Sequence, residues 1–161
     1  MRQFFKPKKS IVMKKLKTFF VAVTVLLATS AFASAGPEKV SPKVKAEFEK
    51  SFTGAVNVNW KKNADYYFAS FTLNSNEVSA AYNENGELVG VSRIIATTQL
   101  PINVALAISS KYQDYDVAKT VTELNFEGQT SYFVVVENSK QILKLKCNSS
   151  GDIMVNNKTK K

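Results

Sequence analysis

The sequence predicts an α+β protein made of two tandem units, each with one helix followed by four antiparallel strands. Two observations support this prediction. A helix pattern followed by four strand patterns occurs twice, over 42–97 and over 98–157. The apolar residues of the second copy also keep the register of the first, with a shift of 60 in the helix and of 65 in the later strands. Because a unit of about 60 residues is small for a solitary domain, we expect the two units to pack together.

Residues 1–35 have the pattern of a secretory signal peptide. A basic segment precedes ten consecutive apolar residues, FFVAVTVLLA, and small residues follow at the spacing of a cleavage site near Ala33 or Ala35. The apolar run is short for a membrane span, which takes roughly 20 residues; an uncleaved N-terminal anchor is the alternative. Translation from either Met1 or Met13 produces this pattern. We expect a periplasmic or secreted protein that makes no stable membrane insertion after cleavage.

The formal net charge of +9 suggests at first a nucleic-acid partner. Seven of the 22 positive residues lie within 1–35, however, and the rest of the chain carries 15 positive and 13 negative side chains. This near balance, together with export, argues against nucleic acid. The basic residues that remain on predicted strands are more typical of a protected sheet surface. They are Lys61, Lys62, Arg93, Lys144 and Lys146.

The first unit begins after a short linker, 36–41. Ser41 is a suitable N-cap and Pro42 suits the first helical position. An apolar residue then recurs every fourth position, at Val44, Phe48 and Phe52. The four strand patterns that follow are VNVNW, YYFASFTLN, EVSAAYN and ELVGVSRII. The links between them are short and polar, and the Asn-Gly pair at 85–86 is typical of a hairpin turn.

The second unit repeats this order. Pro101 opens its helix, and the four-residue apolar spacing returns at Val104, Ile108 and Tyr112. Its strand patterns are KTVTELNF, TSYFVVVE, QILKLKC and DIMVNN. A basic tail, 158–161, is expected to follow the last strand.

These segments resemble the secreted PepSY-like domains of Bacteroidetes, which are grouped with the β-lactamase-inhibitor-protein fold. The likeness rests on the order of its elements over about 38–157: Trp60 on the first strand, the aromatic second strand, the turn at 85–86 and the Leu-Pro pair at 100–101. The resemblance implies two helix-plus-four-strand units side by side, whose sheets together form an open, concave surface. It also implies inhibitor-like occlusion of a protein or peptide partner by that surface and its hairpin loops. The chain lacks the disulfides of the inhibitor branch, since Cys147 is its only cysteine.

No arrangement of residues predicts catalysis. The sequence has no histidine, one cysteine and no glycine-rich phosphate loop. Asp114 and Asp116 lie close together, but the segment lacks the glycine and the later glutamate of a calcium loop, and we interpret it as a solvated helix end. We therefore expect a protein that is not an enzyme and has neither a cofactor nor a metal site.

The strand patterns place apolar groups on both faces of the sheet. One helix covers only one face of each unit, so the outward groups must meet water, the other unit or a partner. An exposed patch of this kind would favour protein binding, whereas burial by the other unit is the structural alternative. The predicted partner-binding residues are Tyr66, Phe68, Phe133, Val135, Ile142 and Lys144.

A small-ligand or cation carrier of the cell envelope is the alternative function. It would use the same face as the floor of a pocket, with Tyr66, Tyr82 and Arg93 as polar contacts. The position of Trp60 is left open between the helix-facing core, which its strand parity favours, and the rim of a binding surface.

Overall fold

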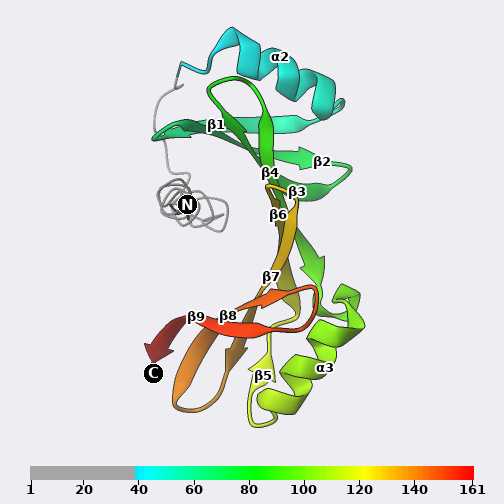
Figure 1. Ribbon diagram of the computed structural model, residues 1–161, viewed down its shortest axis with the longest axis vertical. Coiled ribbons are helices and arrows are strands. Elements are labelled where there is room, and N and C mark those ends of the chain that lie inside the picture. The colour runs from blue at the N-terminus through cyan, green and yellow to red at the C-terminus, as the bar shows by residue number, and fades with distance from the viewer. Residues whose placement is uncertain (1–38) are drawn as a thin grey trace, which may run out of the picture.

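The computed structural model describes residues 39–161, so the expected signal peptide and the first half of the linker, 36–38, lie outside the described residues. Within them, two α-helices and one short 3-10 helix accompany nine strands of a single antiparallel sheet (Figure 1). This confirms the α+β class. The elements in chain order are α2 (Pro42–Ser51), β1 (Val56–Asn63), β2 (Tyr66–Leu73), β3 (Asn76–Asn83), β4 (Leu88–Ala96), η1 (Thr97–Gln99), α3 (Ile102–Lys111), β5 (Asp116–Val117), β6 (Thr120–Phe126), β7 (Gln129–Glu137), β8 (Gln141–Asn148) and β9 (Ile153–Lys160).

Helix α2 begins where its sequence signals place it. The Val44 backbone N–H donates to the Ser41 hydroxyl at 3.3 Å, and Pro42 occupies the first turn, where a missing N–H costs nothing. Val44 and Phe48 are buried against the sheet. The helix ends at the cap residue Phe52, whose N–H donates to the Phe48 carbonyl. The predicted apolar stripe is therefore the face that packs on the sheet.

Tight turns with positive φ join the first four strands. Asn74 and Ser75 link β2 to β3 with φ of 49° and 64°, the pattern that matches the twist of antiparallel strands. At the β3–β4 turn, Gly86 has a φ of 77° and its N–H donates to the Asn83 carbonyl at 3.0 Å. The polar links read from the sequence are thus hairpin turns.

The second half departs from the expected order in two places. Asp116–Val117 forms a short extra strand, β5, which pairs with β7, so this half has five strands instead of four. Two residues are too few to show the alternation of apolar and polar side chains by which a strand is predicted. Strand β9 runs to Lys160, so residues expected in a separate basic tail form the end of an edge strand.

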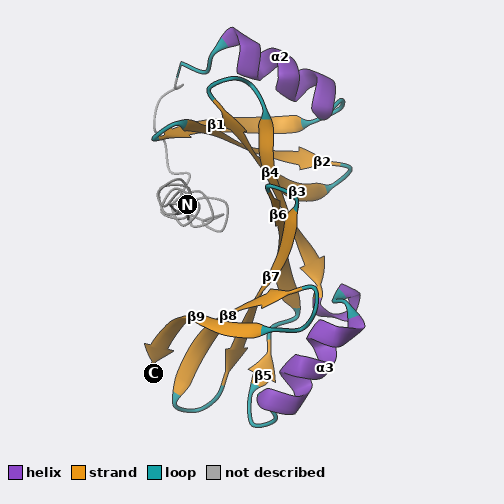
Figure 2. Ribbon diagram, viewed as in Figure 1, coloured by secondary structure: helices purple, strands orange, loops and turns teal. Residues whose placement is uncertain are grey.

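One continuous sheet joins the two halves. Strand β4 pairs with β6 over seven residues, from Gly90 opposite Phe126 to Ala96 opposite Thr120. The strand order is β1-β2-β3-β4-β6-β7-β8-β9, with β5 beside β7. Figure 2 shows the two helices at opposite ends of the molecule with the strands between them. The edges of the sheet are therefore β1 and β9.

Three buried clusters make up the core. One lies under α2 and includes Phe48 and Tyr82, and another lies under α3 and includes Ile108 and Cys147. The third contains no helical residue. It consists of Phe68, Ala81, Leu124, Phe126 and Phe133, with Tyr66 and Val89 packed against it.

Candidate docking surface

The third cluster marks the sheet face that neither helix covers, which we call the helix-free face. Along β2, Tyr67, Ala69 and Phe71 belong to the cluster under α2, whereas Phe68 between them belongs to the third cluster. Along β7, Val134 and Val136 lie under α3 and Phe133 does not. The strand alternation read from the sequence therefore assigns faces correctly in both halves.

The exposure expected for two of the predicted partner-binding residues is wrong. Phe68 retains 1% and Phe133 retains 4% of its surface, so both are core residues. The reason lies in the middle strands. Gly90 stands between Ala81 and Phe126 in one row across the sheet, and a Cβ there would come within 2.7 Å of the Phe126 ring. Small residues let rings from both halves pack together, which strand-by-strand parity does not reveal.

The other four predicted residues keep part of their surface: Tyr66, Val135, Ile142 and Lys144 are all half-buried. The Tyr66 ring lies 6.3 Å from the Phe68 ring, at the border of the buried cluster. Burial raises the pKa of Tyr66 above its ordinary value, with smaller contributions from Glu127 and Asp65.

A row of five side chains crosses the second half of the helix-free face, with an exposed apolar side chain at each end. Strand register places Ile94, Thr122, Phe133, Lys146 and Met154 side by side on β4, β6, β7, β8 and β9. Ile94 is 38% and Met154 is 53% exposed, at the two ends of the row. The Lys146 ammonium lies 6.0 Å from the centre of the Phe133 ring, and burial lowers its pKa.

Each half has a shallow hollow on this side of the sheet. The hollow in the second half has a volume of about 190 Å³ and is lined by Ile94, Phe133, Val135 and Lys144 among others. The hollow in the first half has a volume of about 260 Å³, and its wall is more polar. Its polar lining consists of Asn57, Asn59, Ser70, Thr72, Glu77 and Ser79.

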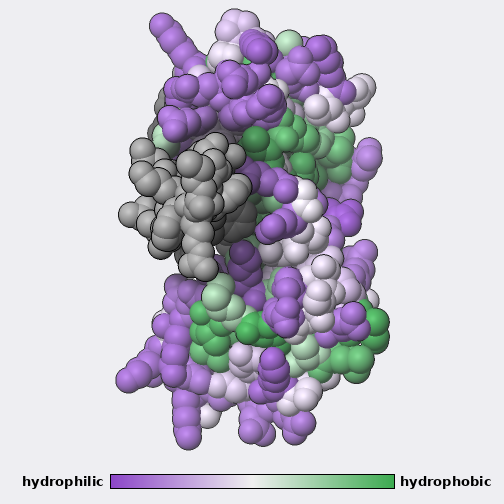
Figure 3. Space-filling view, in the orientation of Figure 1, coloured by the Kyte–Doolittle hydropathy of each residue, from purple (hydrophilic) through white to green (hydrophobic). Residues whose placement is uncertain are grey.

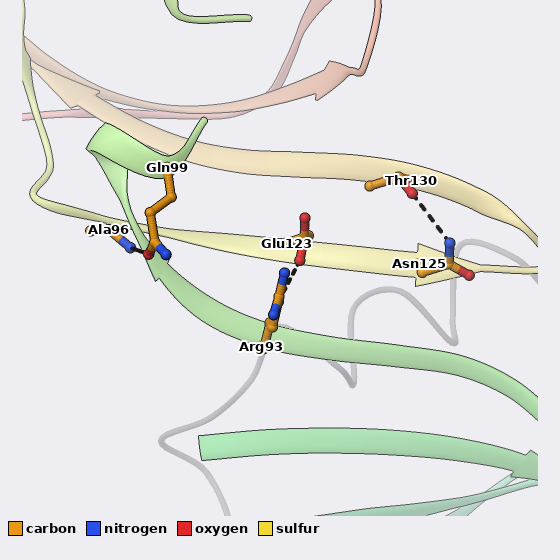
Figure 4. Close-up of polar contacts among 6 residues, drawn as sticks. All are labelled: Arg93, Ala96, Gln99, Glu123, Asn125 and Thr130. Atoms are coloured by element: carbon orange, nitrogen blue, oxygen red, sulfur yellow. Dashed lines mark hydrogen bonds and ion pairs between the residues drawn. The ribbon is translucent and has the colours of Figure 1, made fainter. Parts of the chain in front are cut away.

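The residues of the alternative ligand site do not come together. Tyr66 lies on the helix-free face, and Tyr82 is fully buried under α2 on the other face. Arg93 lies at the seam between the halves, where its Nε donates to a Glu123 carboxylate oxygen at 2.5 Å (Figure 4). The Arg93 side chain is 60% exposed, so this pair is a surface contact rather than the floor of a pocket.

Trp60 lies in the helix-facing core, at its outer edge. It is half-buried in the cluster under α2, and its ring meets the Phe48 ring edge-on at 5.2 Å. It also lines an open groove of about 440 Å³ beside α2.

In Figure 3 the two ends of the molecule are mostly hydrophilic, and hydrophobic side chains gather in bands beneath α2 and over the second half.

The described residues offer little for chemistry. In 39–161, no three side chains among Cys, Asp and Glu are close enough together to hold a metal ion. Cys147 is fully buried, and burial raises the pKa of its thiol from 9.0 to about 11, which suppresses the reactive thiolate. Neither helix of this part of the chain is long and apolar enough to cross a bilayer.

The fold and this surface define a class of protein: an α+β chain with one long antiparallel sheet, one face under two helices and the other free of them. No family model and no curated protein matches the chain. Solved structures from Bacteroides do match, and the chain has the fold of these BLIP-like and DUF2874 proteins. This confirms, at the level of the fold, the resemblance seen in the sequence.

Three of these structures are similar to this chain to much the same degree. A BLIP-like protein from Bacteroides fragilis is 21% identical, with a TM-score of 0.62, and the match covers 78% of this chain and 89% of that one. A DUF2874 family protein from Bacteroides uniformis is 20% identical, with a TM-score of 0.65 over 76% and 90%. A protein proposed to be periplasmic, from Bacteroides eggerthii, is 19% identical, with a TM-score of 0.65 over 76% and 89%.

Sequence reasoning missed one set of polar residues on the helix side. Lys43, Glu47 and Ser51 of α2 line a cavity together with Tyr82 and Glu87. The three helical residues are spaced by four and form a polar stripe beside the apolar one, a pattern that any solvated helix face shares.

Proposed function

We propose that this chain is a non-catalytic binding protein of the periplasm or the extracellular space that engages a protein partner through the helix-free face. The observation that carries the proposal is the row across the second half. Ile94 and Met154 expose apolar surface there, on either side of the buried Phe133 ring and the Lys146 stem. Exposed apolar groups around a well-packed centre are typical of contact surfaces.

We also propose that the two halves, 42–97 and 98–157, are copies of one unit. The turns support this proposal, because the hydrogen bonds of one turn correspond one to one with those of the other. The Asn83 carbonyl accepts from the Gly86 N–H, and the Asn83 side chain accepts from the Glu87 N–H. The same bonds link Asn148 to Gly151 and to Asp152, each 65 residues later. The register of β2 with β3 likewise returns in β7 with β8 at the same shift.

A repeated unit gives a reason for a curved contact surface. Each half carries its helix on the outer side, and in Figure 1 the strands at both ends of the sheet turn toward the side away from the helices. The hollows of the two halves lie on that side. A concave face of this shape fits a convex protein partner better than a small molecule. The BLIP-like name of the Bacteroides fragilis structure agrees with an inhibitor-like mode of action, in which the partner is occluded and not modified.

Surface variants with a matched control test this proposal. The purified protein is immobilised and used to capture proteins from the envelope of the producing bacterium, in parallel with Ile94→Asp and with Leu106→Asp. Leu106 is a suitable control because it is 59% exposed on α3, on the opposite side of the sheet. We expect a partner that binds the unmodified protein and the Leu106 variant, and binds the Ile94 variant at least tenfold more weakly.

Two results would contradict the proposal. Equal capture by all three proteins would show that binding does not use the helix-free face. A concentration-dependent dimer that Ile94→Asp abolishes, seen by light scattering, would show that the face binds a second copy of this chain. The first half then provides a further check, because Asn59→Asp in its polar hollow should weaken a partner that spans both halves.

A further inference from the structure

The cavity between α2 and the β3–β4 turn contains a buried donor with no acceptor. Tyr82 is fully buried, and its hydroxyl makes no hydrogen bond of normal geometry. The Ser51 hydroxyl, which donates to the Glu47 carbonyl at 2.8 Å, lies near enough to lower the pKa of the phenol, but the two hydroxyls are not placed for a hydrogen bond of normal geometry. A buried hydroxyl without a partner is costly, so such a group needs an explanation.

The cavity is large enough for a small organic molecule. Its volume is about 550 Å³, within the range of small-molecule sites. The lining is mostly polar, which distinguishes it from an ordinary packing defect. The lining residues are Lys43, Glu47, Ser51, Tyr82, Asn85, Gly86, Glu87 and Leu88.

The two glutamates around the cavity have hydrogen-bond or ion-pair partners among the described residues, whereas the lysine makes no ion pair with a described carboxylate. Glu47 pairs with Lys50 at 2.8 Å, and Glu87 accepts from the Asn83 amide at 2.5 Å. Lys43 makes no ion pair with any carboxylate in 39–161. Two donors, the Lys43 ammonium and the Tyr82 hydroxyl, are thus available for an acceptor that the described residues do not supply.

The second half provides an internal comparison. The residues 60 or 65 positions after Lys43, Glu47 and Tyr82 are Asn103, Ala107 and Cys147. There the turn packs directly on the helix, because a Cβ at Gly151 would lie 2.7 Å from the Asn103 carbonyl oxygen. At Gly86 the corresponding distance to the Lys43 carbonyl oxygen is 3.6 Å. The first half therefore holds its turn farther from the helix and lines the gap with polar groups.

We propose that this cavity binds a small zwitterion of the amino-acid type. The carboxylate of the ligand accepts hydrogen bonds from the Tyr82 hydroxyl and the Lys43 ammonium. Its ammonium group lies against the carboxylates of Glu47 and Glu87. A neutral zwitterion matches both sets of charges, whereas a simple anion would be repelled by the two glutamates. Burial raises the pKa of Tyr82, Ser51 opposes this and Glu47 adds a smaller contribution, so the phenol remains a donor at neutral pH.

This site is independent of the proposed docking surface, because Tyr82 and α2 lie on the other face of the sheet. Amide NMR spectra recorded with glycine, leucine, acetate or methylamine test it directly. We expect the two amino acids to shift the Gly86 and Glu87 resonances at millimolar concentrations, with little effect from acetate or methylamine. Charge-assisted hydrogen bonds predict that Tyr82→Phe and Lys43→Met each weaken binding about tenfold or more.

Two variants serve as controls. Tyr66→Phe removes a phenol outside the cavity, and Lys45→Met removes a charge on α2 that does not line it; both should bind as the unmodified protein does. Because Tyr82→Phe removes an unpaired buried hydroxyl, it should remain folded and melt at or above the unmodified protein without ligand. Absence of any shift with the amino acids, or unchanged binding by Tyr82→Phe, would overturn the proposal. Equal binding of acetate would overturn the zwitterion and indicate an anion site.

Discussion

Substitution of alanine for three turn glycines gives a graded test of how closely the β8–β9 turn approaches α3. Gly151 has a φ of 93°, and a Cβ there would lie 2.7 Å from the Asn103 carbonyl oxygen. Gly128 has a φ of 77°, but its Cβ would meet nothing within 4 Å. Gly86 also has a φ of 77°, with the flexible Lys43 side chain at 3.3 Å. The three positions share an unfavourable backbone and differ in what the new methyl group meets.

The expected magnitudes follow from these contacts. A positive φ costs an L residue roughly 1–2 kcal/mol, so Gly128→Ala should lower the free energy of unfolding by about that much. At Gly151 the methyl group meets helix backbone that cannot move aside, and overpacking adds roughly 1–3 kcal/mol. Gly151→Ala should therefore cost about 2–5 kcal/mol. Gly86→Ala should fall between them, because the Lys43 side chain can rotate away.

Urea unfolding monitored by circular dichroism and by Trp60 fluorescence measures these differences. Trp60 is the only tryptophan and lies in the first half, whereas Gly151 lies in the second. Because β4 and β6 join the halves, we expect both signals to give the same midpoint for every variant. A Gly151→Ala variant as stable as Gly128→Ala would refute the close approach of the turn to α3.

Three further predictions concern single side chains. Phe68→Ala should lower the free energy of unfolding by about 3–5 kcal/mol in urea titrations, because Phe68 is buried, and a loss below 1 kcal/mol would show an exposed ring. Arg93→Ala should cost less than about 1 kcal/mol in the same assay, because the pair with Glu123 is largely solvated. Native Cys147 should react with iodoacetamide at pH 8 at least about 100-fold more slowly than in urea, since a pKa of about 11 instead of 9.0 lowers the thiolate fraction by that factor. Because the folded state holds this proton more tightly, stability should fall between pH 9 and 11 more in the unmodified protein than in Cys147→Ala, and equal slopes would contradict a raised thiol pKa.

Sequence periodicity predicted local structure well and packing between halves poorly. The four-residue stripes found the buried faces of both helices, and the parity of Phe68 and Phe133 placed them on the correct face of the sheet. The alternation of side chains along a strand shows which residues share a face of the sheet, but it does not show what covers that face. Phe68 lies opposite Ala81, and Gly90 on the next strand leaves room for the Phe126 ring, an effect of small residues that appears only once the strand order is known.

The polar cavity was hidden for a related reason. Lys43 and Glu47 are ordinary residues for a solvated helix face, and nothing in α2 distinguishes them. Their meaning depends on the β3–β4 turn, which brings Glu87 and the end of β3 over the helix. Comparison of the two halves was the available signal, because Lys43 and Glu47 correspond to Asn103 and Ala107 when the two helix patterns are aligned at a shift of 60.

The two halves therefore differ where their functions are proposed to differ. The first half has a polar cavity under its turn and a polar hollow on the helix-free face. The second half closes the corresponding cavity, and its strands β6 to β8 lie between the exposed Ile94 of β4 and the exposed Met154 of β9 on the helix-free face. Because the two sites lie on opposite faces, each should respond to its own variant: Tyr82→Phe should spare partner binding and Ile94→Asp should spare the ligand. If Tyr82→Phe weakened binding of the partner, the cavity and the helix-free face would be coupled through β3 and β4, since Tyr82 pairs with Leu88 and β4 carries Ile94. Reciprocity then requires the partner to change ligand affinity by the same factor, which a titration of the complex with leucine would measure.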